Sequence, residues 1–398
     1  MPQGPTWPWA LGSLLLVLLV LVTMLAGRVL VSRAQQGQER VPAPTVPLFA
    51  VAAVAHPVDG AQLLALDQDA GRLAVLTSRE ETPPCPPVGT CPAPARPDSF
   101  ALLDGTTGAT LSSTPLTGAA AAAADASQLV VDASQHLVYA ISPHAVVAFS
   151  TETAARIGGY ALSDASQGDR LSGAALMPEG AGAALLLLTG NKLHLLDAAS
   201  GEILAQQALP SGLDALDGPV LDGDGTRSFV LAAANGQSSL LVFDTAHLRL
   251  FGEYTLPSGA RLGSLDATHN GLYILGADGT TWRIALAALR PGSSVPPLAP
   301  VPALYGAQAF GANGTLGHSY VAGTEGMGSL DAASGRMLAE LPLHPLWSAT
   351  QPLPVDVQRG LLYVLAAHGS VVILHDGTPP PALSAASATI LARAALTT

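Results

Sequence analysis

The chain has 398 residues, a net charge of −12 and only 12% Asp, Glu, Lys and Arg, about half of the usual fraction. Hydrophobic residues make up 49% of it, and Gly (41) and Pro (32) are abundant. This composition excludes a nucleic-acid-binding protein, which needs a basic surface, and a disordered acidic protein, which would be less apolar. A compact fold rich in turns remains.

The N-terminal segment 1–33 contains an uncharged stretch from Trp9 to Gly27. Its 19 residues, at about 1.5 Å per residue, roughly span the hydrocarbon core of a bilayer. The stretch therefore predicts a single transmembrane helix that anchors the chain in the cell membrane. A cleaved signal peptide is the alternative, although its apolar region would be shorter and would follow basic residues.

Two features conflict over the side of the membrane on which the rest of the chain lies. Arg28, Arg33 and Arg40 follow the apolar stretch, and the positive-inside rule would place them in the cytoplasm. Cys85 and Cys91, the only cysteines, lie close together in a Pro-rich insert and indicate a disulfide, which persists in an oxidising compartment. A metal site, the alternative for this pair, would need two further ligands nearby. Because long domains translocate largely regardless of flanking charge, we favour an extracytoplasmic domain.

Two segments of biased composition flank the central region. Residues 34–46 combine glutamines with spaced prolines, which predicts an extended linker. Residues 378–398 contain the proline run 379–381 and continue with Ala, Ser and Thr, which fits either a short helix or a disordered tail. The folded domain is therefore expected at 47–377.

The region 47–377 contains a repeated marker, a strand that ends in Asp or Ser before a turn. Its copies end at Asp104, Ser150, Asp197, Asp244 and Asp331, with a weaker copy at Asp376. The intervals are 46, 47, 47, 87 and 45 residues, so the fourth interval spans two periods. A leucine also follows twelve residues after each of the first five copies. A fixed period of this length indicates a repeat architecture.

Each period contains four short β-strands separated by turns. In the copy 210–256, short strands are predicted at 219–221, 228–232, 240–243 and 250–256, and the turn Asn235-Gly236 is a hairpin signal. The nearly continuous apolar runs are typical of sheets covered on both faces. Four short strands per repeat predict an all-β fold of radially stacked sheets, a β-propeller.

The repeats predict seven blades, with six or eight as alternatives. The predicted copies are 58–116, 117–162, 163–209, 210–256, 257–298, 299–343 and 344–377. The last copy lacks a fourth strand, while residues 47–55 form a spare strand at the other end of the domain. Pairing of this strand into the last sheet would close the ring and hide a sheet edge.

Four segments resemble the repeats of YVTN/YncE-like propellers, which lead from a turn into Leu-Tyr-Val. They are Gln358–Ala366, His269–Leu275, Gln135–Ile141 and Asp222–Val230. The resemblance spans most of 47–377 and implies a propeller of a family that is often exported. This family includes lactonase-like and quinoprotein-like relatives, so an enzyme with a site in the central channel is the alternative function.

Residues capable of chemistry form no recognised catalytic constellation. The Asp-x-x-x-Gly turns that begin at Asp104, Asp197 and Asp331 recur with the repeats, which indicates hydrogen-bonded turns instead of an acid cluster. The histidines show none of the spacings typical of metal sites, and neither a nucleophile elbow nor a phosphate-binding loop occurs. We therefore predict no catalytic residue, no metal and no cofactor.

A ligand, if there is one, is expected at the mouth of the central channel. The links from the last strand of one blade to the first strand of the next carry the candidates Asp169, Arg170, Asp214, Asp217 and Arg261, and Trp347 is an aromatic candidate. Ordinary solvated loops are the alternative interpretation. The sequence thus favours a membrane-anchored, extracytoplasmic, non-catalytic binding or scaffold module for a protein, peptide or envelope component.

Overall fold

The computed structural model describes residues 49–55, 60–78, 98–162, 170–179, 182–266, 271–276, 281–290, 299–301, 307–323, 326–332, 336–341, 353–365 and 369–377. The predicted transmembrane helix, the linker, the cysteine insert and the C-terminal tail lie outside these residues. Within them, none of the helices has the length and apolar character that a membrane crossing requires.

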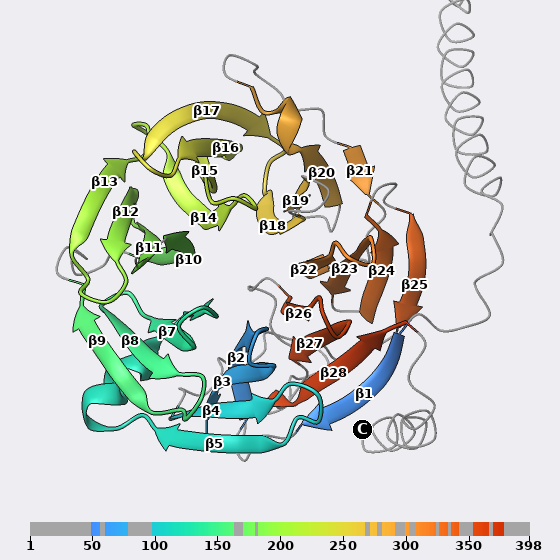
Figure 1. Cartoon of the computed structure of the whole chain (residues 1–398). Helices are drawn as coiled ribbons and strands as arrows, with labels where there is room; N and C mark the ends of the chain where they lie inside the picture. The colour runs from blue at the N-terminus through green and yellow to red at the C-terminus, as the bar shows by residue number, and fades with distance from the viewer. Residues whose placement is uncertain are drawn as a thin grey trace, which may run out of the picture. The chain divides into compact units, whose positions relative to one another are not determined.

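The strands form seven four-stranded sheets arranged in a ring, with the first strand of each sheet near the centre and the last at the perimeter (Figure 1). Sheet 1 contains β2 (Gly60–Asp67), β3 (Arg72–Ser78), β4 (Ser99–Asp104) and β5 (Thr110–Pro115). Sheet 2 contains β6 (Gln128–Asp132), β7 (Leu137–Ile141), β8 (Ala145–Ser150) and β9 (Arg156–Ala161). Sheet 3 contains β10 (Leu171–Glu179), β11 (Gly182–Thr189), β12 (Lys192–Asp197) and β13 (Ile203–Ala208).

Sheet 4 contains β14 (Asp214–Leu221), β15 (Arg227–Ala234), β16 (Gln237–Asp244) and β17 (Arg249–Leu256). Sheet 5 contains β18 (Arg261–Asp266), β19 (Gly271–Leu275), β20 (Thr281–Ala285) and β21 (Ala299–Val301). Sheet 6 contains β22 (Ala307–Asn313), β23 (His318–Gly323), β24 (Gly326–Asp331) and β25 (Met337–Leu341). The all-β propeller predicted from the sequence is confirmed.

Sheet 7 joins the two ends of the domain. It contains β26 (Val355–Asp356), β27 (Leu361–Leu365), β28 (Val371–Asp376) and, as its outermost strand, β1 (Phe49–Ala55). β1 pairs antiparallel with β28, from Phe49 opposite Asp376 to Ala55 opposite Val371 (Figure 1). The predicted ring closure by the spare N-terminal strand is therefore confirmed.

Burial follows the order of the strands within each sheet. The second and third strands, such as β15 and β16, are almost entirely buried, whereas the outermost strands β9 and β13 are mostly exposed. The turn between β15 and β16 has positive φ at both Asn235 (50°) and Gly236 (79°), as its sequence predicted. Apolar middle strands thus build the contacts between sheets, and turn residues reverse the chain between them.

Stacked apolar side chains hold neighbouring sheets together. The rings of Phe100 in sheet 1 and Phe149 in sheet 2 stack with centroids 4.3 Å apart. Among the described residues, two short 3-10 helices lie in loops, η1 (Gly118–Asp125) after sheet 1 and η2 (Leu286–Ala288) after β20. The repeated leucines fill the ends of sheets, since Leu116, Leu209 and Leu256 are buried.

One repeat boundary differs from the prediction. The sixth copy was expected to begin at residue 299, but Ala299–Val301 form β21 and pair with β20 of the fifth sheet. The Pro-rich stretch before them resembles a link between repeats, although a strand of the fifth sheet still follows it. A short strand after a proline cluster carries too few alternating residues for the sequence alone to assign it.

Candidate functional site

The antiparallel sheets give the ring two faces with different loops. We call the turn face the side that carries the loops after the first and third strands of each sheet, such as 68–71 and 105–109 in sheet 1. The link face is the opposite side, which carries the loops after the second and fourth strands, such as 142–144 and 209–213. These two faces serve to locate the polar residues that the structure describes.

Three of the predicted ligand-binding residues lie on the link face. Arg170 directly precedes β10, Asp214 opens β14 and Arg261 opens β18, so they occupy equivalent places in three successive sheets, and all three are exposed. Asp217 is half-buried and accepts a hydrogen bond from the backbone N–H of Gly218 at 2.8 Å. Asp169 and Trp347 lie outside the described residues.

The innermost strands approach one another closely beside these residues. The side-chain amide of Gln128 on β6 donates to the backbone oxygen of Ala174 on β10 and accepts from its N–H, both at 2.7 Å. A Cβ at Gly173 would lie 1.9 Å from the backbone oxygen of Gly218, so only glycine permits this approach of β10 to β14. The link face therefore presents charged side chains at the start of tightly packed strands.

The turn face contains a second repeated marker that the sequence analysis missed. An Asp or Asn stands at the end of the innermost strand, five residues before the start of the second strand, in six of the repeats: Asp67, Asp132, Asp222, Asp266, Asn313 and Asp356. Apart from Asp266, whose side chain is not described, all are buried. The constant five-residue offset could have identified them from the sequence.

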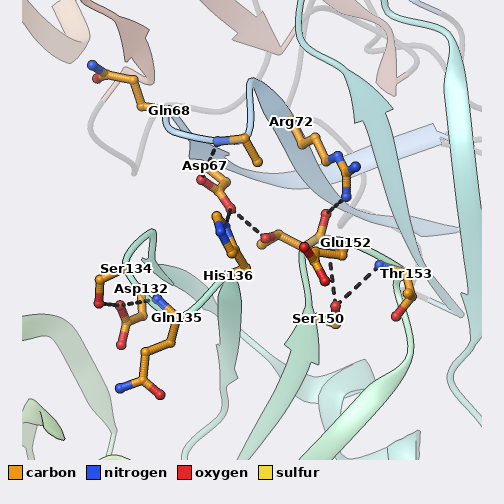
Figure 2. A network of polar contacts seen from close by, with 12 residues as sticks. Asp67, Gln68, Arg72, Asp132, Ser134, Gln135, His136, Ser150, Glu152 and Thr153 are labelled. Carbon is orange, nitrogen blue, oxygen red and sulfur yellow. Dashed lines mark hydrogen bonds and ion pairs between the residues drawn. The ribbon is translucent and has the colours of Figure 1, made fainter.

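Asp67 is hydrogen-bonded both to its own turn and to a neighbouring sheet (Figure 2). One carboxylate oxygen accepts a hydrogen bond from the N–H of Ala70 in its own turn at 3.0 Å. The other accepts from the hydroxyl of Thr151 in sheet 2 and lies 3.3 Å from Nδ1 of His136, also in sheet 2. Arg72 of sheet 1 donates to the backbone oxygen of Thr151 at 2.7 Å. Polar contacts therefore join the two sheets on the turn face.

A second buried acid joins sheets 6 and 7. One carboxylate oxygen of Asp376 accepts a hydrogen bond from the hydroxyl of Tyr320 and lies 2.6 Å from Nδ1 of His318. The hydrogen bond to this carboxylate raises the pKa of His318 above its usual value, although burial acts in the opposite direction. Burial and the charge of Asp376 raise the pKa of Tyr320, which keeps its proton for the hydrogen bond.

Tyrosines in the second strands make a further set of bonds between sheets. The hydroxyl of Tyr363 in sheet 7 donates to the backbone oxygen of Gly105 in sheet 1 at 2.9 Å. In the same way, the hydroxyl of Tyr273 in sheet 5 lies 2.9 Å from Oγ of Ser319 in sheet 6. Each of these tyrosines belongs to an apolar second strand, and its hydroxyl contacts a polar group of the next sheet.

The Asp-x-x-x-Gly turns that begin at Asp104 and Asp197 are hydrogen-bonded turns, as the sequence predicted. Asp104 accepts from the N–H groups of Thr106 and Thr107 at 3.0 and 2.7 Å, and Asp197 accepts from the N–H of Ser200 at 2.7 Å. Partial burial raises the pKa of Asp104, but the hydrogen bonds from Thr107 and Thr106 outweigh it and leave the pKa low. The hydroxyl of Ser200 likewise lowers the pKa of Asp197.

These carboxylates are engaged separately, each by its own turn or by a neighbouring sheet. Within the described residues, no group of three or more His, Cys, Asp or Glu side chains is arranged to hold a metal ion. Polar contacts of the turn face, such as those of Asp67 and Asp376, therefore join neighbouring blades. The charged residues Arg170, Asp214 and Arg261 of the link face are exposed to solvent.

Comparison with known proteins supports the fold alone. No family model matches the chain. No curated protein matches it in sequence either. The β-propeller domain of Myceliophteria thermophila Cps50 (Swd1) is similar in structure, with a TM-score of 0.60 and 12% identity over 82% of this chain and 99% of that domain.

Chaetomium thermophilum Raptor is also similar, with a TM-score of 0.61 and 12% identity over 83% of this chain. The similar region covers only 29% of Raptor. At this identity, the similarity shows a common backbone arrangement and gives no information about activity. The finding common to sequence, structure and comparison is that the chain is a β-propeller.

Proposed function

We propose that the chain is a membrane-tethered, extracytoplasmic β-propeller that binds a protein, a peptide or an envelope component without catalysing a reaction. The observation that carries this proposal is the division of polar groups between the two faces. On the turn face, Asp67 and Asp376 are buried and hydrogen-bonded to a neighbouring sheet. On the link face, Arg170, Asp214 and Arg261 are exposed. We assign partner binding to the link face.

The link face combines charge with an exposed apolar side chain. Leu216, two residues after Asp214 on β14, is 45% exposed. Arginine contributes strongly to protein interfaces because its planar guanidinium both donates several hydrogen bonds and packs on apolar groups. Arg170 and Arg261 on either side of sheet 4 are therefore the residues expected to contribute most to binding.

The tether and the location depend on the N-terminal and cysteine segments. The apolar stretch 9–27 has the length of a membrane span, and a Cys85–Cys91 disulfide would require an oxidising compartment. The resemblance to exported YVTN/YncE-like propellers supports the same location. Protease added outside intact cells should degrade the domain, and mass spectrometry should find Cys85 linked to Cys91. Complete protection of the domain from the protease would reverse the proposed orientation. Two free thiols would mean that the cysteines give no support to an oxidising compartment.

Site-directed crosslinking tests partner binding by the link face. A photocrosslinking amino acid replaces Leu216 in the membrane-anchored full chain, and a matched chain carries it at Asp69, which is exposed on the turn face. We expect crosslinked products from position 216 that disappear in the R170A/D214A/R261A background and are absent from position 69. Products that persist unchanged in that background would contradict the assignment.

A further inference from the structure

Five outermost strands contain a β-bulge whose extra residue is apolar. The pairing with the third strand skips one residue in each: Leu111 in β5, Ile157 in β9, Leu204 in β13, Phe251 in β17 and Leu338 in β25. Each stands seven residues after the strand-ending Asp or Ser of its repeat. The apolar bulge residue is therefore a regular feature of the repeat.

Four of these residues, which we call the outer apolar rim, are exposed to solvent. Leu111, Ile157, Leu204 and Phe251 are 51%, 59%, 51% and 38% exposed, and they belong to the four successive sheets 1 to 4. A bulge changes the twist of a strand but does not require an apolar side chain. Single exposed apolar residues are ordinary, whereas recurrence at one structural position points to a shared contact.

The bulges also indicate what kind of partner the rim accepts. An extra residue interrupts the ladder and bends the edge, which disfavours addition of a further β-strand. The rim lies near the turn face, because each outermost strand begins directly after a turn-face loop. Equivalent positions in a ring share one plane, so a flat surface can contact all four residues together.

The first described strand of the domain begins at the same face. β1 begins at Phe49 opposite Asp376, where β28 reaches the turn face. Twenty-one residues, 28–48, separate Phe49 from the apolar stretch 9–27. Such a segment extends at most about 70 Å and spans about 25 Å as a flexible chain. A tether of this length raises the effective concentration of the surface at the rim to the millimolar range.

Charged groups of both signs accompany the rim. Arg156 precedes Ile157, and Arg249 precedes Leu250 and Phe251; both arginines are exposed. The carboxylates of Asp104 and Asp197 lie in turn-face loops, and hydrogen bonds hold their pKa values low, so they are negatively charged. Lipids with phosphatidylcholine headgroups offer a phosphate to the arginines and a cation to the carboxylates, whereas purely anionic headgroups would repel the latter.

We propose that the outer apolar rim rests on a zwitterionic phospholipid surface, the same bilayer that holds residues 9–27. This inference rests on the proposed tether. The four side chains of the rim enter the boundary between headgroups and acyl chains, about 5–10 Å deep, as the apolar faces of peripheral helices do. The turn face then points to the membrane, and the link face points away from it towards a partner.

The test uses the full chain in phosphatidylcholine nanodiscs that contain a phospholipid with a photoreactive acyl chain. After irradiation and proteolysis, we expect lipid adducts on peptides from β5, β9, β13 and β17 as well as on the peptide 9–27. The variant L111S/I157S/L204S/F251S should form at least tenfold fewer adducts on the four strands and should keep those on 9–27. The control S113A/Q206S/T255S changes exposed residues of three of these strands and should label like the unaltered chain.

The outcomes separate the rim from the tether. Adducts on 9–27 without adducts on the strands would overturn the rim proposal and leave the tether intact. Absence of adducts from 9–27 would overturn the tether and, with it, the rim proposal. A chain that sediments as a dimer in detergent, and as a monomer when the four rim residues are serine, would show that the rim contacts a second copy instead of lipid. Unchanged thermal unfolding of the serine variant verifies that the fold is intact.

Discussion

The turn face and the link face of the propeller use polar residues in opposite ways. On the turn face, Asp67 and Asp376 are buried, and each is hydrogen-bonded to a neighbouring sheet. On the link face, Asp214 and Arg261 are exposed at the starts of innermost strands. The role of an acid in this fold therefore cannot be read from its residue type, because its surroundings decide whether it joins two blades or is exposed to solvent.

The largest effect should come from opening the ring, on which both faces depend. Deletion of residues 47–55 removes β1, the outermost strand of sheet 7, and exposes the edge of β28. We expect a loss of several kcal/mol of stability, measured by thermal unfolding, together with aggregation. Addition of a synthetic peptide with the deleted sequence should restore much of the lost thermal midpoint of unfolding. An unchanged midpoint in the deleted chain would contradict closure by this strand.

The next largest effect should distinguish the faces directly. Asp67→Ala leaves the hydroxyl of Thr151 and the N–H of Ala70 without an acceptor, which should cost about 2–3 kcal/mol in urea unfolding. Asp69→Ala, in the same turn but exposed, and Asp214→Ala on the link face should each change stability by less than about 0.5 kcal/mol. Equal costs for Asp67 and Asp214 would remove the distinction between the faces.

A smaller effect is expected for a tyrosine that joins sheets. Tyr363→Phe removes the hydrogen bond to the backbone oxygen of Gly105 and should cost about 1 kcal/mol. Tyr160→Phe is the matched control, since the hydroxyl of Tyr160 is buried without a hydrogen-bond partner among the described residues. This control should be neutral or slightly stabilising. A larger loss from the control than from Tyr363→Phe would show that these hydroxyls do not join the sheets.

The smallest effect should be a pH dependence confined to sheets 6 and 7. The folded-state pKa of His318 lies above its unfolded value because of Asp376, so folding favours the protonated form. This stabilisation is complete below the ordinary histidine pKa of about 6.5 and is lost as the pH rises through the folded-state pKa. As the pH rises from about 6, the urea midpoint should therefore fall less in His318→Asn than in the unaltered chain. An equal fall of the midpoint in both chains would contradict this dependence.

Several features were predictable because they depend on neighbours in the chain. The strand-ending acids and the leucines twelve residues later identified the repeats, and Asn235-Gly236 identified a hairpin. The short strand Ala299–Val301 was assigned to the wrong repeat, since its place depends on pairing with β20. The buried acids at the ends of the innermost strands were missed, although their fixed distance from the second strand was present in the sequence.

The sequence by itself determined the period, the short strands, the turns and the strand that closes the ring. These follow from local turn chemistry and from apolar runs, which need no information about distant residues. Only the tertiary structure decided that Asp67 meets Thr151, 84 residues away, and that His318 meets Asp376, 58 residues away. It also decided that the apolar bulge residues lie exposed at the perimeter. The physical reason is that contacts between sheets depend on the twist and spacing of stacked blades, which no single repeat encodes.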